Sequence, residues 1–107
     1  MAASFNNRPT QNIGPVLAPI YQATVKTIAI GALLVNKMPG YVPVTVLHRS
    51  AAGVDTSLAC NESVRGGLSV DPLSGKKLVL LPGDQLMASA PIANSFDGFV
   101  SILEGVS

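Results

Sequence analysis

Residues 76–103 read KKLVLLPGDQLMASAPIANSFDGFVSIL and decide the fold that we expect for this chain. Three apolar runs of strand length, 76–81, 85–90 and 96–103, are separated by short turn-like segments. Pro82 sets φ for the first central position of a tight turn, and Gly83 supplies the positive φ that the second position needs. Because a parallel return requires a connection of about a dozen residues, so short a loop favours antiparallel pairing. The stretch therefore predicts a hairpin followed by a third strand, a β-meander.

The pattern in this stretch is a leucine-rich strand, Pro-Gly-Asp, a second strand, a loop of small and polar residues, and then Asp-x-x-Val-Ser-x-Leu-Glu. It resembles the closing part of a small β-sandwich protein of tailed bacteriophages. Residues 28–36 and 42–47 are similar to the opening strands of that family, so the resemblance covers about residues 23–104, without a match between 51 and 74. It implies a structural component of the virion and leaves its place in the particle open. The matching residues are Leu78, Leu80, Pro82, Gly83, Asp84, Asp97, Val100, Ser101, Leu103 and Glu104.

Composition points to a subunit of an assembly. The 107 residues are enough for one domain, and 48% of them are hydrophobic while only 12% are charged. In ordinary soluble proteins, roughly a quarter of the residues are charged. Because a small domain has a large surface, much of that surface must be apolar, which indicates burial against partners.

Charge and hydropathy argue against other classes of partner. The net charge of +1 and the single basic pair at 76–77 do not favour nucleic-acid binding. The apolar run 28–35 is far shorter than the roughly 20 residues that cross a bilayer. The first residues resemble no secretory signal, and the single Cys60 permits no internal disulfide, so we expect assembly in the host cytoplasm.

Residues 1–20 are predicted to form an extended N-terminal arm, and residues 21–107 the β-sandwich domain. The segment contains three prolines among Asn, Gln and Thr and has no sustained apolar period. A disordered tail is one reading. We prefer an arm that docks on a neighbouring subunit through its four aliphatic side chains, Ile13, Val16, Leu17 and Ile20.

The rest of the chain is rich in Val, Ile and Thr and in turn residues. Residues 21–35 predict a strand, with Ile28, Ile30, Ala32 and Leu34 on one face and an apolar second face near its end. Further short strands are expected at 42–47, 54–60 and 68–70. Seven or eight short strands with turns every 8 to 12 residues indicate one all-β domain, an antiparallel sandwich or a jelly-roll-like barrel.

The last strand supplies further candidate residues. Period-two alternation places Phe96, Val100 and Ile102 on one face and Asp97, Phe99, Ser101 and Leu103 on the other. We expect the first set to fill the core. Phe99 and Leu103 are then candidates for a contact between subunits. Asp84 and Asp97 are expected to cap loop N–H groups, with cation binding as the alternative.

The sequence gives no pattern for catalysis, for a metal or for a cofactor. His48 has no second histidine or cysteine pair beside it, and no serine stands in a Gly-x-Ser-x-Gly turn. We therefore expect a non-enzymatic homo-oligomer in the virion that contacts the connector, the tail or the major capsid protein. An accessory protein of the neck, collar or tail is the first hypothesis and a head decoration protein the second. A tail-fibre attachment or carbohydrate-binding module is the third, although only Tyr21 and Tyr41 could serve as stacking platforms.

Overall fold

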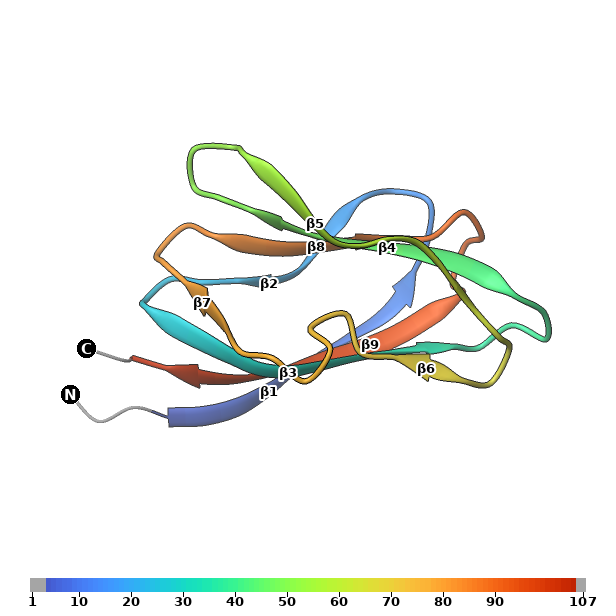
Figure 1. Ribbon diagram of the computed structural model, residues 1–107, viewed down its shortest axis with the longest axis horizontal. Coiled ribbons are helices and arrows are strands. Elements are labelled where there is room, and N and C mark those ends of the chain that lie inside the picture. Colours follow the sequence, from blue (N-terminus) through green and yellow to red (C-terminus); the bar gives the residue numbers. More distant parts are fainter. Residues whose placement is uncertain (1–3, 106–107) are drawn as a thin grey trace.

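A computed structural model describes residues 4–105, which form two antiparallel β-sheets packed face to face (Figure 1). Sheet A has the order β1-β9-β3, with β6 and β7 both pairing with the far side of β3. Sheet B has the order β2-β8-β4-β5. The strands are β1 (Ser4–Ile13), β2 (Ala18–Gln22), β3 (Thr27–Asn36), β4 (Val42–Arg49), β5 (Asp55–Val64), β6 (Ser69–Val70), β7 (Leu78–Leu80), β8 (Gln85–Ser89) and β9 (Phe96–Glu104).

The predicted antiparallel β-sandwich is confirmed, with nine strands instead of seven or eight. The core lies between the sheets, where valines of β4 meet aliphatic residues of β3 and β9. Phe96, Val100 and Ile102 are completely buried, as their alternation predicted. The inward faces of β3, β4 and β9 therefore hold the two layers together, whereas β1 and β5 each add one buried residue, Ile13 and Val64.

The prediction of a β-meander at 76–103 is wrong. The turn at Pro82 and Gly83 forms, with Gly83 at φ 93° and the Asp84 amide donating to the Leu81 carbonyl (2.9 Å). However, β7 pairs with β3 in sheet A, whereas β8 pairs with β2 and β4 in sheet B. A tight Pro-Gly turn can connect two paired strands of a hairpin, but it can also connect strands of two different sheets, as it does here. The Gly83 amide donates to Ala23 (2.8 Å) and so fixes the crossing.

The prediction of a separate arm at residues 1–20 is also corrected. β1 pairs with β9 from Ser4 to Thr10 and again at Ile13, so that it forms one edge of sheet A, and β2 forms the adjacent edge of sheet B. Ile13 and Ile20 are buried in the chain's own core. An edge strand needs a partner on one side only, which accommodates the polar composition of β1. The boundary at residue 20 thus disappears, and the described residues make one sandwich.

The predicted strand at 21–35 is two strands, and its faces differ from the expected pattern. The chain turns between Gln22 and Thr27, and the register of β3 against β9 shifts between Ala29 and Gly31. This irregularity adds one residue and inverts the alternation. Ile28 and Ile30 consequently lie half-buried on the outer side of the sheet, opposite to Ala32 and Leu34 in the core.

Close backbone packing fixes the end of the sandwich at which β3 and β5 end. Asn36 is buried; its side-chain amide donates to the carbonyls of Gly40 (2.9 Å) and Val64 (2.8 Å), and its Oδ1 accepts from the Met38 amide (2.8 Å). Gly66 passes so close that a Cβ there would lie 2.3 Å from the Met38 carbonyl oxygen. The turn after β3 is thereby tied to the end of β5.

Candidate functional site

The outward side of sheet A carries a row of apolar side chains that crosses four strands. Phe5 of β1 pairs with Leu103 of β9, which pairs with Ile28 of β3, which in turn pairs with Val79 of β7. Directly opposite residues in antiparallel strands share a face and touch. Phe5 is 73% exposed and Val79 is also exposed, so the row ends in solvent at both edges.

A second apolar row runs parallel to the first. Pro9 of β1 pairs with Phe99 of β9, and Phe99 pairs with Leu33 of β3. Asn7 and Ser101 pair between the rows, and the Ser101 hydroxyl donates to Asn7 Oδ1 (2.7 Å). We call this surface the outer A face, defined by the apolar residues Phe5, Pro9, Ile28, Ile30, Leu33, Val79, Phe99 and Leu103.

The outer A face is the side of sheet A that does not pack against sheet B. The opposite sides of β1, β3 and β9 pack inward, so these eight side chains have no second layer over them within residues 4–105. Phe99 is 40% exposed, and Leu103 is half-buried by its strand neighbours. The eight side chains are all uncharged. An apolar surface of this extent is typical of protein–protein contacts.

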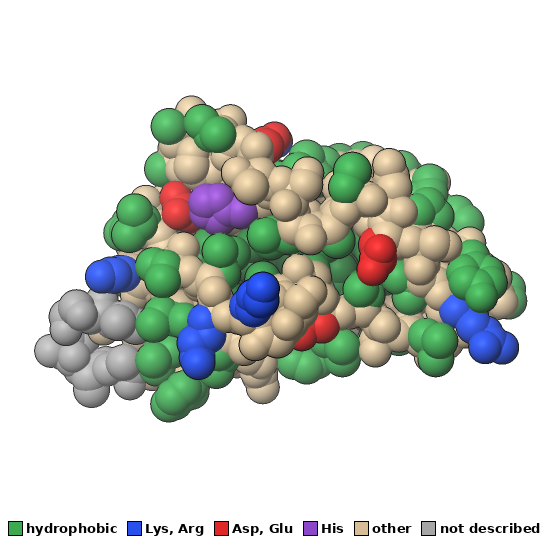
Figure 2. All heavy atoms as spheres, viewed as in Figure 1, with side chains coloured by type: hydrophobic (Ala, Val, Ile, Leu, Met, Phe, Trp, Pro, Cys, Tyr) green, Lys and Arg blue, Asp and Glu red, His purple; other side chains and the backbone are tan. Residues whose placement is uncertain are grey.

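The outward side of sheet B is more polar and serves as an internal comparison. Arg49 and Asp55 form a bidentate ion pair there, with Nε–Oδ1 at 2.7 Å and Nη2–Oδ2 at 3.0 Å. Met87 is apolar but buried, and it pairs with Pro19 and Leu47. Figure 2 illustrates how few charged side chains reach the visible surface and how widely hydrophobic ones do.

The ion pair between Lys37 and Asp97 borders the outer A face at the N-terminal end of β9. Asp97 Oδ1 accepts a hydrogen bond from the Asn12 amide (3.0 Å) and lies 3.0 Å from Lys37 Nζ. The hydrogen bond from Asn12, assisted by Lys37, lowers the pKa of Asp97. Asp97 therefore binds a backbone N–H group and a lysine, which leaves the apolar rows free of its charge.

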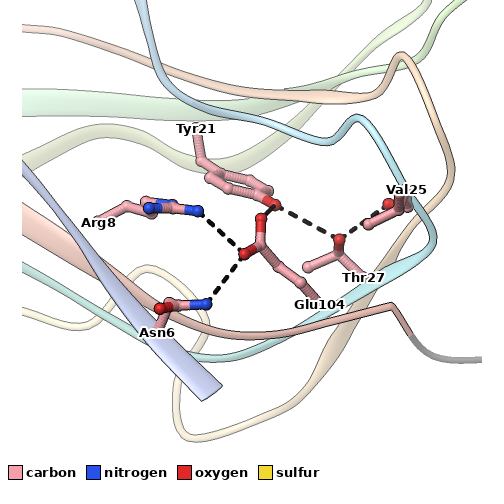
Figure 3. Close-up of polar contacts among 6 residues, drawn as sticks. All are labelled: Asn6, Arg8, Tyr21, Val25, Thr27 and Glu104. Atoms are coloured by element: carbon pink, nitrogen blue, oxygen red, sulfur yellow. Dashed lines mark hydrogen bonds and ion pairs between the residues drawn. The ribbon is translucent and has the colours of Figure 1, made fainter. Parts of the chain in front are cut away.

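A polar cluster at the other end holds the two terminal strands together (Figure 3). Glu104 accepts hydrogen bonds from Asn6 Nδ2 (3.0 Å), Arg8 Nη2 (2.9 Å) and the Tyr21 hydroxyl (2.8 Å), and Tyr21 lies 3.4 Å from Thr27 Oγ1. The bond from Tyr21, with smaller contributions from Arg8 and Asn6, lowers the pKa of Glu104 despite its burial. Burial raises the pKa of Tyr21.

This cluster has a structural consequence for the outer A face. It links β1 and β9 of sheet A to β2 of sheet B, and it lies on the inner side of sheet A, opposite the row that Phe5 and Leu103 form. Three donors, on Asn6, Arg8 and Tyr21, converge on the Glu104 carboxylate. We interpret it as a clamp that fixes the end of the sandwich.

The Asp84 carboxylate joins three neighbouring parts of the chain through hydrogen bonds. Its carboxylate accepts from the amides of Ala51 (3.1 Å) and Leu81 (3.0 Å) and lies 3.1 Å from His48 Nε2. Burial pushes the pKa of Asp84 upward, but these hydrogen bonds outweigh it, and the pKa is lowered. The His48 contact explains where the single histidine goes, and within residues 4–105 no serine side chain completes a triad with it.

The four aliphatic candidates of the N-terminal segment lie in different environments. Ile13 and Ile20 are buried in the core, Leu17 is half-buried and Val16 is 77% exposed on the loop from β1 to β2. A mainly apolar pocket of about 260 Å³ opens beside this loop and is lined in part by Ile13, Val16 and Ile20. Only Val16 thus remains available as a protruding contact.

Several residues of the outer A face escaped the sequence analysis. Leu33 belongs to the apolar second face near the end of the predicted strand 21–35, and that apolar face was the one sequence signal for it. Phe5 lies in a polar segment that reads as an arm, and Ile28 and Ile30 exchange faces because of the irregularity in β3. Phe99 and Leu103 were predicted from alternation and do lie together on this surface.

The described residues offer little for other chemistry. Residues 4–105 contain no group of three His, Cys, Asp or Glu side chains close enough to hold a metal ion. No helix in this range has the length and hydrophobicity to span a membrane. Cys60 is exposed on β5 and forms no disulfide.

Comparison with solved structures identifies proteins of similar fold. Two crystal structures of a pentameric capsid protein isolated from metagenomic phage sequences align with 92% of this chain, at 15% identity and a TM-score of 0.51. The alignments cover 61% and 62% of the capsid protein, so this chain spans about three fifths of its length. The NLP core of Drosophila aligns over 98% of this chain and 99% of its own, at 13% identity and a TM-score of 0.48.

No protein-family profile matches the sequence, and no curated protein sequence matches it. At 15% identity, the likeness to the capsid protein establishes the sandwich fold alone.

Proposed function

We propose that this chain is a non-enzymatic structural subunit of a bacteriophage particle and that it works as a homo-oligomer. The outer A face carries this proposal, because it leaves eight apolar side chains without a second layer. The low content of charged residues, 12% of the chain, agrees with a subunit whose surface is largely covered in use. The likeness of the fold to a pentameric phage capsid protein supports the same function.

The structure suggests how such a subunit works. Burial of exposed apolar area drives association without requiring directional bonds, so it can hold copies together wherever their surfaces match. The sandwich supplies a rigid support, since the core and the Glu104 clamp fix the strands that present the surface. The subunit contributes shape and contact area to the particle and needs no cofactor.

Within the particle, we place a head protein, as a capsid or decoration subunit, before an accessory protein of the neck, collar or tail. A free N-terminal arm that could wrap a ring would favour the neck, but residues 4–20 belong to the sandwich. The similar structures are of a capsid protein, which favours the head. Contacts with the major capsid protein, the connector or the tail are part of this proposal.

Copy number in purified particles tests the proposal and distinguishes these positions. Quantitative peptide mass spectrometry of gradient-purified particles, from a phage whose genome encodes this chain, should detect it at a level comparable to the major capsid protein. A small copy number would favour a ring at the neck or tail over the head. Absence from particles that package DNA normally would refute a structural role.

One observation favours a second candidate function, carbohydrate binding during adsorption. Tyr41 is 69% exposed and borders a pocket of about 420 Å³ that is also lined by Glu62, Ser63 and Arg65. An exposed aromatic ring beside polar groups is a common arrangement for stacking a sugar. A glycan array should then give hits that Tyr41→Ala removes, and an array without hits would eliminate this function.

A further inference from the structure

We propose, building on the function above, that copies of this chain associate by packing their outer A faces against each other and not by joining sheet edges. The inference rests on two independent sets of observations. One is the state of every sheet edge in residues 4–105, and the other is the chemistry and size of the outer A face.

Both edge strands on one side of the sandwich contain features that block strand addition. β1 has Pro9 in its middle, and its register shifts between Thr10 and Ile13, where Asn12 adopts φ 60°. β2 has Pro19, followed by a register shift before Tyr21. Proline cannot donate a ladder hydrogen bond, and an irregular register bends the strand away from a flat partner.

The edges on the other side are blocked differently. β6 and β7 have only two and three residues. β5 has ten residues, but its register against β4 shifts twice, and Asn61 in its middle adopts φ 50°. The Thr45 hydroxyl accepts a hydrogen bond from the Asn61 amide (3.1 Å), which fixes this irregularity. Each described edge is therefore short or interrupted, so pairing with a further strand is disfavoured on all sides.

The outer A face lacks such protection. Neither row contains a charged side chain that would keep two such faces apart. Lys37 and Asp97, at the border of the face, form an ion pair with each other. A strongly charged partner would lose water from its own charges on this surface without finding counter-charges. A second copy brings the same uncharged rows and therefore matches in chemistry.

The size of the face determines how strong a contact between two copies can be. Nine residues of β9 extend about 30 Å, and four strands at about 4.8 Å spacing give a patch of roughly 500 Å². A stable pair of proteins typically buries about 800 Å² on each partner. One such contact is therefore weak and depends on concentration, and a larger assembly needs another contact on each subunit.

Thiol protection tests this arrangement on the full chain. In a Cys60→Ser background, Ser101→Cys places a single thiol between the two rows of the outer A face, and Ser89→Cys on β8 places one on the outward side of sheet B. Unmodified protein reports on the β5 edge through Cys60. Each protein is labelled with a maleimide across a dilution series, while its mass is followed by light scattering.

We expect the thiol at position 101 to react at least about tenfold more slowly in the associated protein than after dilution. The thiols at positions 89 and 60 should react equally fast at all concentrations. Protection of Cys60 would mean that β5 edges pair and would overturn the inference. Full reactivity at position 101, or equal protection at all three positions, in a sample with oligomeric mass would also overturn it.

The two levels of the account fail in distinguishable ways. A monomeric mass at every concentration would refute the homo-oligomer of the proposed function together with this contact. An oligomeric mass with an unprotected thiol at position 101 would refute only the packing of outer A faces.

Discussion

Replacement of Phe5 by Asp is expected to abolish self-association while the subunit stays folded. Phe5 is 73% exposed in the subunit. For an aromatic side chain of about 200 Å², roughly 150 Å² then faces solvent and roughly 50 Å² packs on neighbouring residues. At about 25 cal/mol per Å², full burial in a contact contributes about 4 kcal/mol, and the internal packing about 1 kcal/mol. Association should therefore weaken about a thousandfold, before the cost of burying a carboxylate is added.

Sedimentation velocity over a concentration series measures the association, and urea unfolding followed by circular dichroism measures the stability of the subunit. Val54→Asp is the matched control, because Val54 is 63% exposed but lies between β4 and β5, outside the outer A face. It introduces the same charge at a similar exposure and should leave association unchanged. If Phe5→Asp sediments like the unmodified protein, or if Val54→Asp is the variant that dissociates, Phe5 does not lie in the contact between copies.

Three further variants have definite expectations. Phe99→Asp should weaken association more than it lowers the urea midpoint, because Phe99 is the exposed centre of the second row, and an unchanged oligomer mass would contradict this. Glu104→Gln should lower the free energy of unfolding by about 1–2 kcal/mol at pH 7, because it removes a charge that accepts three hydrogen bonds. Since the folded-state pKa of Glu104 is lowered, this stabilisation is present above the unfolded-state pKa of about 4.3 and disappears as pH falls through the folded-state pKa. Urea titrations at pH 7 and at about pH 3 should therefore give a larger difference from the unmodified protein at the higher pH, and a constant difference would disprove the explanation. Gly66→Ala should cost about 2–3 kcal/mol, because its Cβ would collide with the Met38 carbonyl, whereas Gly40→Ala has free space and should cost far less. Equal losses for the two glycine variants in the same unfolding assay would rule out the collision.

Local features of the fold were readable from the sequence. The Pro82-Gly83 turn and the inward face of β9 were predicted because each depends on a few adjacent residues. The sheet that each strand joins was not predictable in this way. β7 and β8 flank a tight turn but belong to different sheets, since the pairing depends on β3 and β2, which are distant in sequence.

The candidate site was predictable only in part, for similar reasons. Phe99 and Leu103 follow from alternation within one strand. Their neighbours Phe5 and Ile28 come from strands whose register depends on pairing with β9 and on the irregularity near Gly31. Residues 4–13 looked like an arm because an edge strand can remain polar. Ile13 and Ile20, predicted as contacts with another subunit, instead fill the core.

The molar mass of the purified full chain in solution shows whether copies of the subunit associate, as the exposed outer A face requires. Light scattering coupled to size-exclusion chromatography, over a range of loading concentrations, gives that mass. The account predicts an oligomer whose mass is a whole-number multiple of the chain mass and which dissociates on dilution. A freely soluble monomer at the highest concentration would contradict it, because the eight apolar side chains of the outer A face would then need no partner.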